Sequence, residues 1–169
     1  DIDVTTVSLS ATPTVTEGGS ITYTASLTNA ATNAVTVTLS GGATITIASG
    51  QATGTATVAA PTDDVYVDAS TVSQSIASVT GGTTFESLTF STVAASTTVP
   101  DDIDVTTVSL SATPTVTEGG SITYTASLTN AATNAVTVTL SGGATITIAS
   151  GQTTGTATVA APTDDAYID

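Results

Sequence analysis

The sequence predicts an all-β protein, and three observations lead to that fold class. Apolar residues alternate with threonine or serine over short stretches, which is the period-two pattern of half-buried strands. Runs rich in glycine, asparagine and aspartate separate these stretches and are typical of turns. No segment shows the apolar period of about 3.6 residues that marks an amphipathic helix.

The chain also repeats itself at the length of a domain. Residues 1–68 recur as residues 102–169, which gives a period of 101 residues. The copies differ at three positions, where Ala52, Val65 and Val67 of the first become Thr153, Ala166 and Ile168 of the second. Such self-similarity predicts a tandem array of whole domains rather than a solenoid of small units. We expect a complete repeat at residues 1–101 and an incomplete one at residues 102–169.

The first four strands of a repeat are expected on either side of short turns. Residues 4–10 and 20–29 alternate strictly and are separated by the turn sequence TEGGS. Residues 34–40 and 43–48 read AVTVTLS and ATITIA, and the glycine turn SGGA joins them. Valine, isoleucine and threonine favour strands because their branched side chains pack well on a pleated surface.

Three more strands complete the repeat. Residues 52–59 follow the turn ASGQ, and residues 71–80 and 85–95 flank the turn TGGTT. Seven short strands in about 100 residues are typical of an immunoglobulin-like antiparallel β-sandwich. The sequence therefore predicts tandem sandwiches of this kind, of which the second has only the first five strands. The expected core residues are Leu9, Ile21, Tyr23, Leu27, Val37, Leu39, Ile45, Ile47, Val58, Ile76, Leu88 and Phe90.

Composition excludes several classes of function. The chain has 14 acidic residues, no lysine, arginine or histidine, and a net charge of -14. We expect neither nucleic-acid binding nor membrane insertion, because those partners recruit basic residues or need long apolar spans. Without histidine, lysine, arginine or cysteine, the chain lacks the usual general bases and activated nucleophiles, so we expect no enzymatic activity. Because the given sequence begins without the pattern of a signal peptide, we expect a soluble piece of a longer protein.

The acidic residues gather in a few loops that the topology should bring together. If successive strands reverse direction, the loops after strands one, three and five share one end of the sandwich with the end of strand seven. Six carboxylates fall there: Glu17, Asp63, Asp64, Asp68, Asp101 and Asp102. Asp104 begins the next repeat, and the second copy supplies Glu118, Asp164, Asp165 and Asp169. At the opposite end Glu86 is expected near Asp1 and Asp3.

Crowded carboxylates without a cation repel one another and resist ionisation. Hard oxygen ligands in this number, with no histidine or cysteine, favour Ca²⁺ over zinc or copper, and Mg²⁺ retains its waters. The sequence therefore predicts calcium at the joint between repeats, holding the short linker stiff. The alternative is a solvated acidic cluster that only aids solubility.

The order of motifs resembles a known family. The segments VSLSATPTVTEGGSITYTASLTNA, VTVTLSGGATITIASGQATGTATVAAPTDDVY and SVTGGTTFESLTF, followed by TTVPDDID, are similar to the extender repeats of giant RTX-type biofilm adhesins of Gram-negative bacteria. The TEGG and DD elements also resemble Calx-β and cadherin-like modules. The resemblance implies type I secretion and an extracellular, cell-surface location. It also implies immunoglobulin-like repeats, stiffened by calcium, that project an adhesive tip. As calcium ligands it implies Glu17, Asp63, Asp64, Asp101, Asp102 and Asp104, although the glycine-rich nonapeptide repeats and secretion signal of these adhesins are absent.

Two other functions stay open at this point. The open edge of residues 102–169 could accept strands from a neighbouring chain, as in a filament or surface-layer subunit. Outward ranks of threonine could instead bind ice or a glycan surface. In an extender module the expected partners are the neighbouring repeats of the same polypeptide.

Overall fold

The computed structural model describes residues 1–163. All regular structure in that range is β-strand, which confirms the all-β, sandwich-like fold class predicted from the alternating sequence. The chain divides into two compact units, residues 1–103 and residues 104–169. No helix in the described range is long and apolar enough to cross a membrane.

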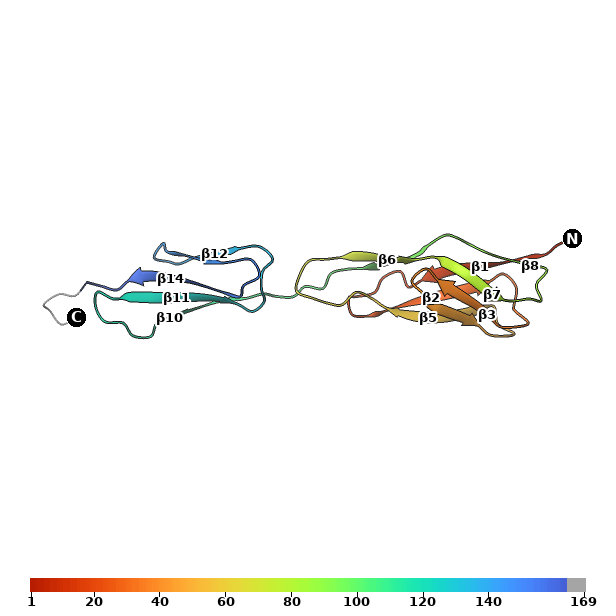
Figure 1. Ribbon diagram of the computed structural model, residues 1–169, viewed down its shortest axis with the longest axis horizontal. Coiled ribbons are helices and arrows are strands. Elements are labelled where there is room, and N and C mark those ends of the chain that lie inside the picture. Colours follow the sequence, from red (N-terminus) through yellow and green to blue (C-terminus); the bar gives the residue numbers. More distant parts are fainter. Residues whose placement is uncertain (164–169) are drawn as a thin grey trace. The chain divides into compact units, whose positions relative to one another are not determined.

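One layer of the first unit is a four-stranded sheet with the order β5-β2-β1-β8 (Figure 1). Its strands are β1 (Val4–Ala11), β2 (Ser20–Leu27), β5 (Thr53–Ala59) and β8 (Ser87–Phe90). The β1–β2 and β2–β5 pairs are antiparallel, but β1 and β8 run parallel. The expectation of a wholly antiparallel sandwich is therefore wrong at this one edge.

The rest of the unit forms a second sheet and a separate strand pair. The sheet has the order β4-β3-β7, with β3 (Val35–Leu39), β4 (Thr44–Ile47) and β7 (Ile76–Gly81). The pair joins β6 (Ser70–Gln74) to β9 (Ala95–Val99). If β6 and β7 are treated as one divided strand, and β8 and β9 as another, the pairings make successive strands run in opposite directions.

The last two expected strands are each divided in the structure. The expected strand over residues 71–80 becomes β6 and β7, because the chain changes partners at Ser75, whose backbone N–H and C=O bond to Ser40. The expected strand over residues 85–95 becomes β8, paired with β1, and β9, paired with β6. This second piece continues to Val99, beyond the expected end at residue 95. The sequence does not show that extension, because a buried polar residue, Thr97, interrupts the apolar alternation of β9.

The core of the first unit lies between these layers. Of the expected core residues, Ile21, Tyr23, Leu27, Val37, Leu39, Ile45, Ile47 and Ile76 are buried, and Leu9, Val58 and Leu88 pack against them. Phe90 is exposed, contrary to expectation, because it ends an edge strand of its sheet. The buried core also contains Val7, Val35 and Val99 and the alanines Ala25, Ala31, Ala60 and Ala95, which are not among the expected core residues.

The second unit holds five strands in two sheets within its described part. The sheet β10-β11-β14 consists of β10 (Val108–Ala112), β11 (Ser121–Leu128) and β14 (Thr154–Ala160). The other sheet pairs β12 (Val136–Thr139) with β13 (Thr145–Ile148). The pairing registers of the first copy recur, so Tyr124 faces Ala157 as Tyr23 faces Ala56. The five-strand half thus folds the same way with and without the strands that follow it in the first unit.

Candidate metal centre

The site begins at the turn between β1 and β2. In residues 16–19 the Gly19 N–H donates to the Thr16 carbonyl, and Gly18 adopts a positive φ of 67°. That conformation favours glycine, which explains the first glycine of the TEGG sequence. The Gly18 N–H also donates to the Pro61 carbonyl at 2.7 Å, so the turn is tied to the loop after β5. These bonds hold Glu17 at the end of the sandwich where β9 also finishes.

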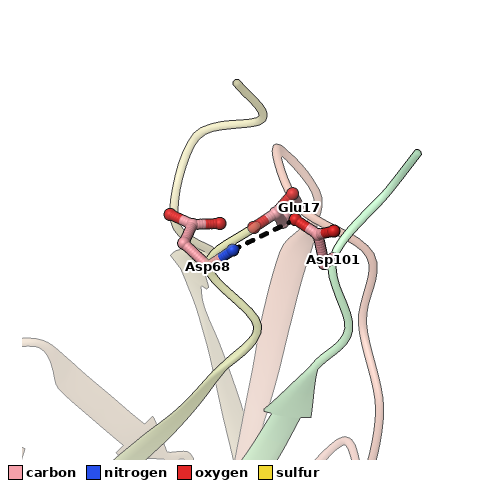
Figure 2. Close-up of side chains that lie close together, drawn as sticks. All are labelled: Glu17, Asp68 and Asp101. Carbon is pink, nitrogen blue, oxygen red and sulfur yellow. Dashed lines mark hydrogen bonds between the residues drawn. The ribbon is translucent and has the colours of Figure 1, made fainter. Parts of the chain in front are cut away.

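Three carboxylates meet beside this turn, as Figure 2 shows: Glu17, Asp68 and Asp101. Each can offer one oxygen such that the three oxygens lie within 4.8 Å of one another. The Asp68 N–H donates to Asp101 Oδ1 at 3.2 Å, which fixes the loop after β5 against the segment after β9. Segments separated by 33 to 85 residues thus come together at one end of the first unit.

Glu17 is the buried member of this cluster. Its side chain is only 8% exposed, and its Oε1 atom has no hydrogen-bond partner among the described residues. Its Oε2 atom accepts from the Asp102 N–H at 3.4 Å. An ionised carboxylate that is buried without a partner for one oxygen is costly, because it loses hydration without replacement. The chain itself offers no side-chain cation to neutralise it.

The surroundings raise the pKa of Glu17 above its ordinary value of 4.5. The first cause is the Asp68 carboxyl group, which is close enough to share a proton with Glu17, followed by desolvation, and the charges of Asp68 and Asp101 add to both. The Asp102 N–H lowers the pKa and only partly opposes these effects. A bond between two carboxyl groups requires a shared proton, so ionisation of both leaves oxygens facing oxygens. A bound cation would relieve the same conflict.

The raised pKa predicts how stability depends on pH when calcium is chelated. A carboxyl that binds its proton more tightly in the folded state contributes stability below pH 4.5, and this contribution is lost as pH rises through the folded pKa. In scanning calorimetry with EDTA, the melting temperature of the first unit should therefore fall as the pH rises from 4.5 through the folded-state pKa of Glu17. Glu17→Gln should flatten the fall, whereas Glu118→Gln, the matched change in the exposed copy of the same turn, should leave it as in wild type. Equal effects of both variants would contradict the assignment to Glu17.

The other acids expected at this end do not join the cluster. Asp64 Oδ1 accepts from the Tyr66 N–H at 2.7 Å, so this carboxylate stabilises its own loop. Asp63 is exposed and lies outside the three-carboxylate group. Asp102 contributes its backbone N–H to Glu17, while its carboxylate accepts from the Ile103 N–H at 2.9 Å. No pattern of side chains could have indicated that backbone contact.

The remaining predicted ligands lie elsewhere. At the opposite end of the first unit, the Asp3 N–H donates to Glu86 Oε2 at 2.8 Å, so these two residues adjoin as expected, and Asp1 is exposed. Asp104 and Glu118 are exposed within the second unit, and Asp164, Asp165 and Asp169 lie outside the described residues.

The second copy acts as a natural comparison for the burial of Glu17. Gly119 has a φ of 70° and donates to the Pro162 carbonyl at 2.7 Å, so the turn is the same. Glu118 is nevertheless exposed. The turn alone therefore does not bury its glutamate. In the first unit, Glu17 is buried because the segments that carry Asp68 and Asp101 lie against it.

The cluster suits a hard cation. Ca²⁺ takes six to eight oxygen ligands, and three carboxylates can supply up to about six of them when each binds through both oxygens. The unpartnered Oε1 of Glu17 is an oxygen of the required kind, held in place by the turn. A site made only of oxygens offers nothing that would select zinc or copper.

Comparison with known proteins adds an independent observation. The model of the LapA domain matches residues 3–102 and again residues 104–169. The chain belongs to the LapA domain family. This family comprises large adhesin proteins, so the chain is an adhesin-related module of a cell-surface or extracellular protein. The two LapA matches start at residues 3 and 104, which are equivalent positions of the two sequence copies. A search of curated proteins found no match.

Proposed function

We propose that the chain is an extender module of a large cell-surface adhesin, stiffened by calcium at the junctions between repeats. Its role is to project an adhesive tip for biofilm formation or surface attachment. Membership of the LapA domain family and the near-identity of the two copies support a repetitive adhesin. The single observation that carries the calcium part is the buried Glu17, unpartnered at Oε1 and facing Asp68 and Asp101.

The position of the cluster explains how calcium would act on the array. Glu17 belongs to the β1–β2 turn, Asp68 follows β5, and Asp101 follows β9 directly before the next repeat. An ion shared by all three would fasten the departing chain to the body of the sandwich. Without it, the carboxylates repel and the segment at residues 100–104 is free to act as a hinge. Binding also stabilises the fold, because the unfolded chain does not assemble these ligands.

The same proposal covers location and chemistry. The module lies outside the cell, is exported by type I secretion as in RTX-type adhesins, and performs no catalysis. Its partners are the neighbouring repeats. Asp104, at the start of the second unit, is a candidate to supply a further ligand from the next repeat.

Small-angle scattering tests the stiffening. The radius of gyration and the maximum dimension of the intact chain should increase between EDTA and millimolar calcium, and the pair-distance distribution should extend to longer distances. Magnesium at the same ionic strength controls for screening of the -14 charge, which alone would change the particle dimensions. Equal curves in EDTA and in calcium would refute the stiffening, even if calcium raised the melting temperature.

One structural observation favours a second candidate, a surface-binding module. Cross-strand neighbours on the sheet β4-β3-β7 form two rows of hydroxyls, Thr46–Thr36–Thr80 and Thr44–Thr38–Ser78. Threonine is also simply a good strand former, so these rows need no ligand to explain them. Activity in an ice-recrystallisation or glycan-array assay at matched calcium would support this candidate, whereas a spacer is inert in both.

A further inference from the structure

The hydroxyl oxygen of Ser70 is buried in the first unit and has no hydrogen-bond partner among the described residues. Within that part of the chain the same holds for Oε1 of Glu17 and for the hydroxyl of Tyr23. Ser70 begins β6, two residues after Asp68 of the carboxylate cluster. A buried hydroxyl without a partner is unfavourable, because its lost bonds to water are not replaced. Two of the three unpartnered atoms therefore belong to residues in or beside the cluster.

Ser70 lies in the same pair of strands as two of the three carboxylates. In the β6–β9 pair it faces Val99, and two residues further along the same register Asp68 faces Asp101. The Asp68 N–H donates to Asp101 Oδ1 at 3.2 Å, so the two segments stay together to this point. Side chains two residues apart in a strand point to the same face of the sheet. Ser70 therefore points to the same face as the carboxylates, one row closer to the core.

The segment after β1 brings Glu17 to the same row from the other side of β9. Thr14 pairs with Thr98 in a parallel bridge, and the Val15 N–H donates to the Thr98 carbonyl at 3.1 Å. Three residues further along both segments, Glu17 adjoins Asp101 (Figure 2). The carboxylate cluster is thus one row of side chains across three neighbouring segments.

The row beneath the carboxylates follows from the same two registers and consists of Val15, Val99 and Ser70. Val99 is completely buried, and Val15 packs against the core. The next residue of β6 on this face is Val72, which also packs against the core. The hydroxyl of Ser70 is therefore an exception in an apolar row, and it lies directly below the carboxylates.

We propose that Ser70 is a positioning residue of the calcium site, and that its hydroxyl holds a water molecule bound to the ion. This inference rests on the proposed function. Rows two residues apart along a strand are separated by about 7 Å, a distance that one bridging water spans between the hydroxyl and an ion held by the carboxylates. Ca²⁺ takes six to eight oxygen ligands, and waters commonly supply some of them. A hydroxyl both donates and accepts, so it can orient such a water toward the ion.

The proposal gives this hydroxyl opposite effects in the two states of the site. Without the ion, the hydroxyl of Ser70 is buried and unpartnered, so it lowers the stability of the fold. With the ion, it fixes a ligand and strengthens binding. A serine with a purely structural role would have the same effect on stability in both states.

The test is isothermal titration calorimetry of the intact chain with calcium chloride, for the wild type and for Ser70→Ala. We expect the substitution to raise the dissociation constant for calcium about three- to tenfold, because one hydrogen bond of ordinary strength is lost. In EDTA, scanning calorimetry should show a melting temperature of the first unit that is equal to or higher than that of the wild type. Glu17→Gln should abolish the binding and so identifies the titrated site.

Ser73→Ala is the matched control. Ser73 lies on the same strand but is exposed, and its hydroxyl bonds to that of Ser96 at 2.6 Å. This variant should bind calcium within about twofold of the wild type.

The inference is overturned if Ser70→Ala binds calcium as tightly as the wild type, or if Ser73→Ala weakens binding equally. It is also overturned if Ser70→Ala lowers the melting temperature in EDTA, because the hydroxyl would then stabilise the fold without the ion. In each of these cases calcium binding that depends on Glu17 leaves the proposed function intact. If the wild-type chain binds no calcium, both proposals fail.

Discussion

Calcium at about one hundred times its dissociation constant should raise the melting temperature of the first unit by about 10–20 °C. Binding that is confined to the folded state contributes about 2.7 kcal/mol at that excess, and each kcal/mol shifts the midpoint of a 60–100-residue domain by about 4–8 °C. The physical reason is the cluster of Glu17, Asp68 and Asp101, whose oxygens meet without a cation from the chain. Scanning calorimetry in EDTA and in millimolar calcium measures the effect.

Substitutions identify which carboxylates cause the calcium-induced rise in the melting temperature. Glu17→Gln and Asp101→Asn should each remove most of the calcium-induced shift, and combining Asp101→Asn with Asp102→Asn should add little. Asp102→Asn alone should retain the shift, because Asp102 meets Glu17 through its backbone N–H. Glu118→Gln is the matched control, since it makes the same change in the same turn where the glutamate is exposed. If the melting temperature is the same in EDTA and in calcium, the cluster is not a calcium site.

Replacing Tyr23 by phenylalanine should stabilise the first unit by about 1–2 kcal/mol, because it removes a buried hydroxyl that lacks a partner. Tyr23 is completely buried, its hydroxyl has no hydrogen-bond partner among the described residues, and burial raises its pKa. The rest of the ring remains, so its packing against the core is retained. Calorimetry should show an increase of about 4–15 °C in the midpoint of the first unit.

The control lies at the same position of the second copy. Tyr124 is only partly buried and borders a hollow of about 310 Å³, so Tyr124→Phe should change the free energy of unfolding of its unit by less than about 0.5 kcal/mol. A lower midpoint for Tyr23→Phe would show that the hydroxyl bonds to something other than the protein, such as a buried water.

The first five strands were predictable from the sequence because each is a simple alternation with one side buried. The last third was not, because β6 to β9 change partners in mid-segment and each piece is too short to show its own period. Thr97 illustrates the difficulty. Its hydroxyl donates to the Thr12 carbonyl at 2.6 Å, so a polar residue occupies a core position.

The candidate site was predictable at the level of loops but not of individual residues. Because successive strands reverse direction, the turn that carries Glu17, the loop after β5 and the segment after β9 all lie at the same end of the sandwich. Which acids meet there depends on local bonds, since the Asp64 carboxylate bonds to the Tyr66 N–H and Asp68 is the residue from that loop that reaches Glu17. These bonds join carboxylate oxygens to backbone N–H groups, and the spacing of acids in the sequence does not encode them.

The parallel pairing of β1 and β8 has a mechanical consequence. The chain enters the first unit at the start of β1 and leaves after β9, which continues along the same direction beside residue 14. Tension between the two ends therefore pulls the first and last strands in opposite senses along their length. Their hydrogen bonds are loaded together in shear rather than opened one at a time, and unfolding under force is governed by the height of that barrier. A module without disulfides can in this way resist mechanical tension between its two ends.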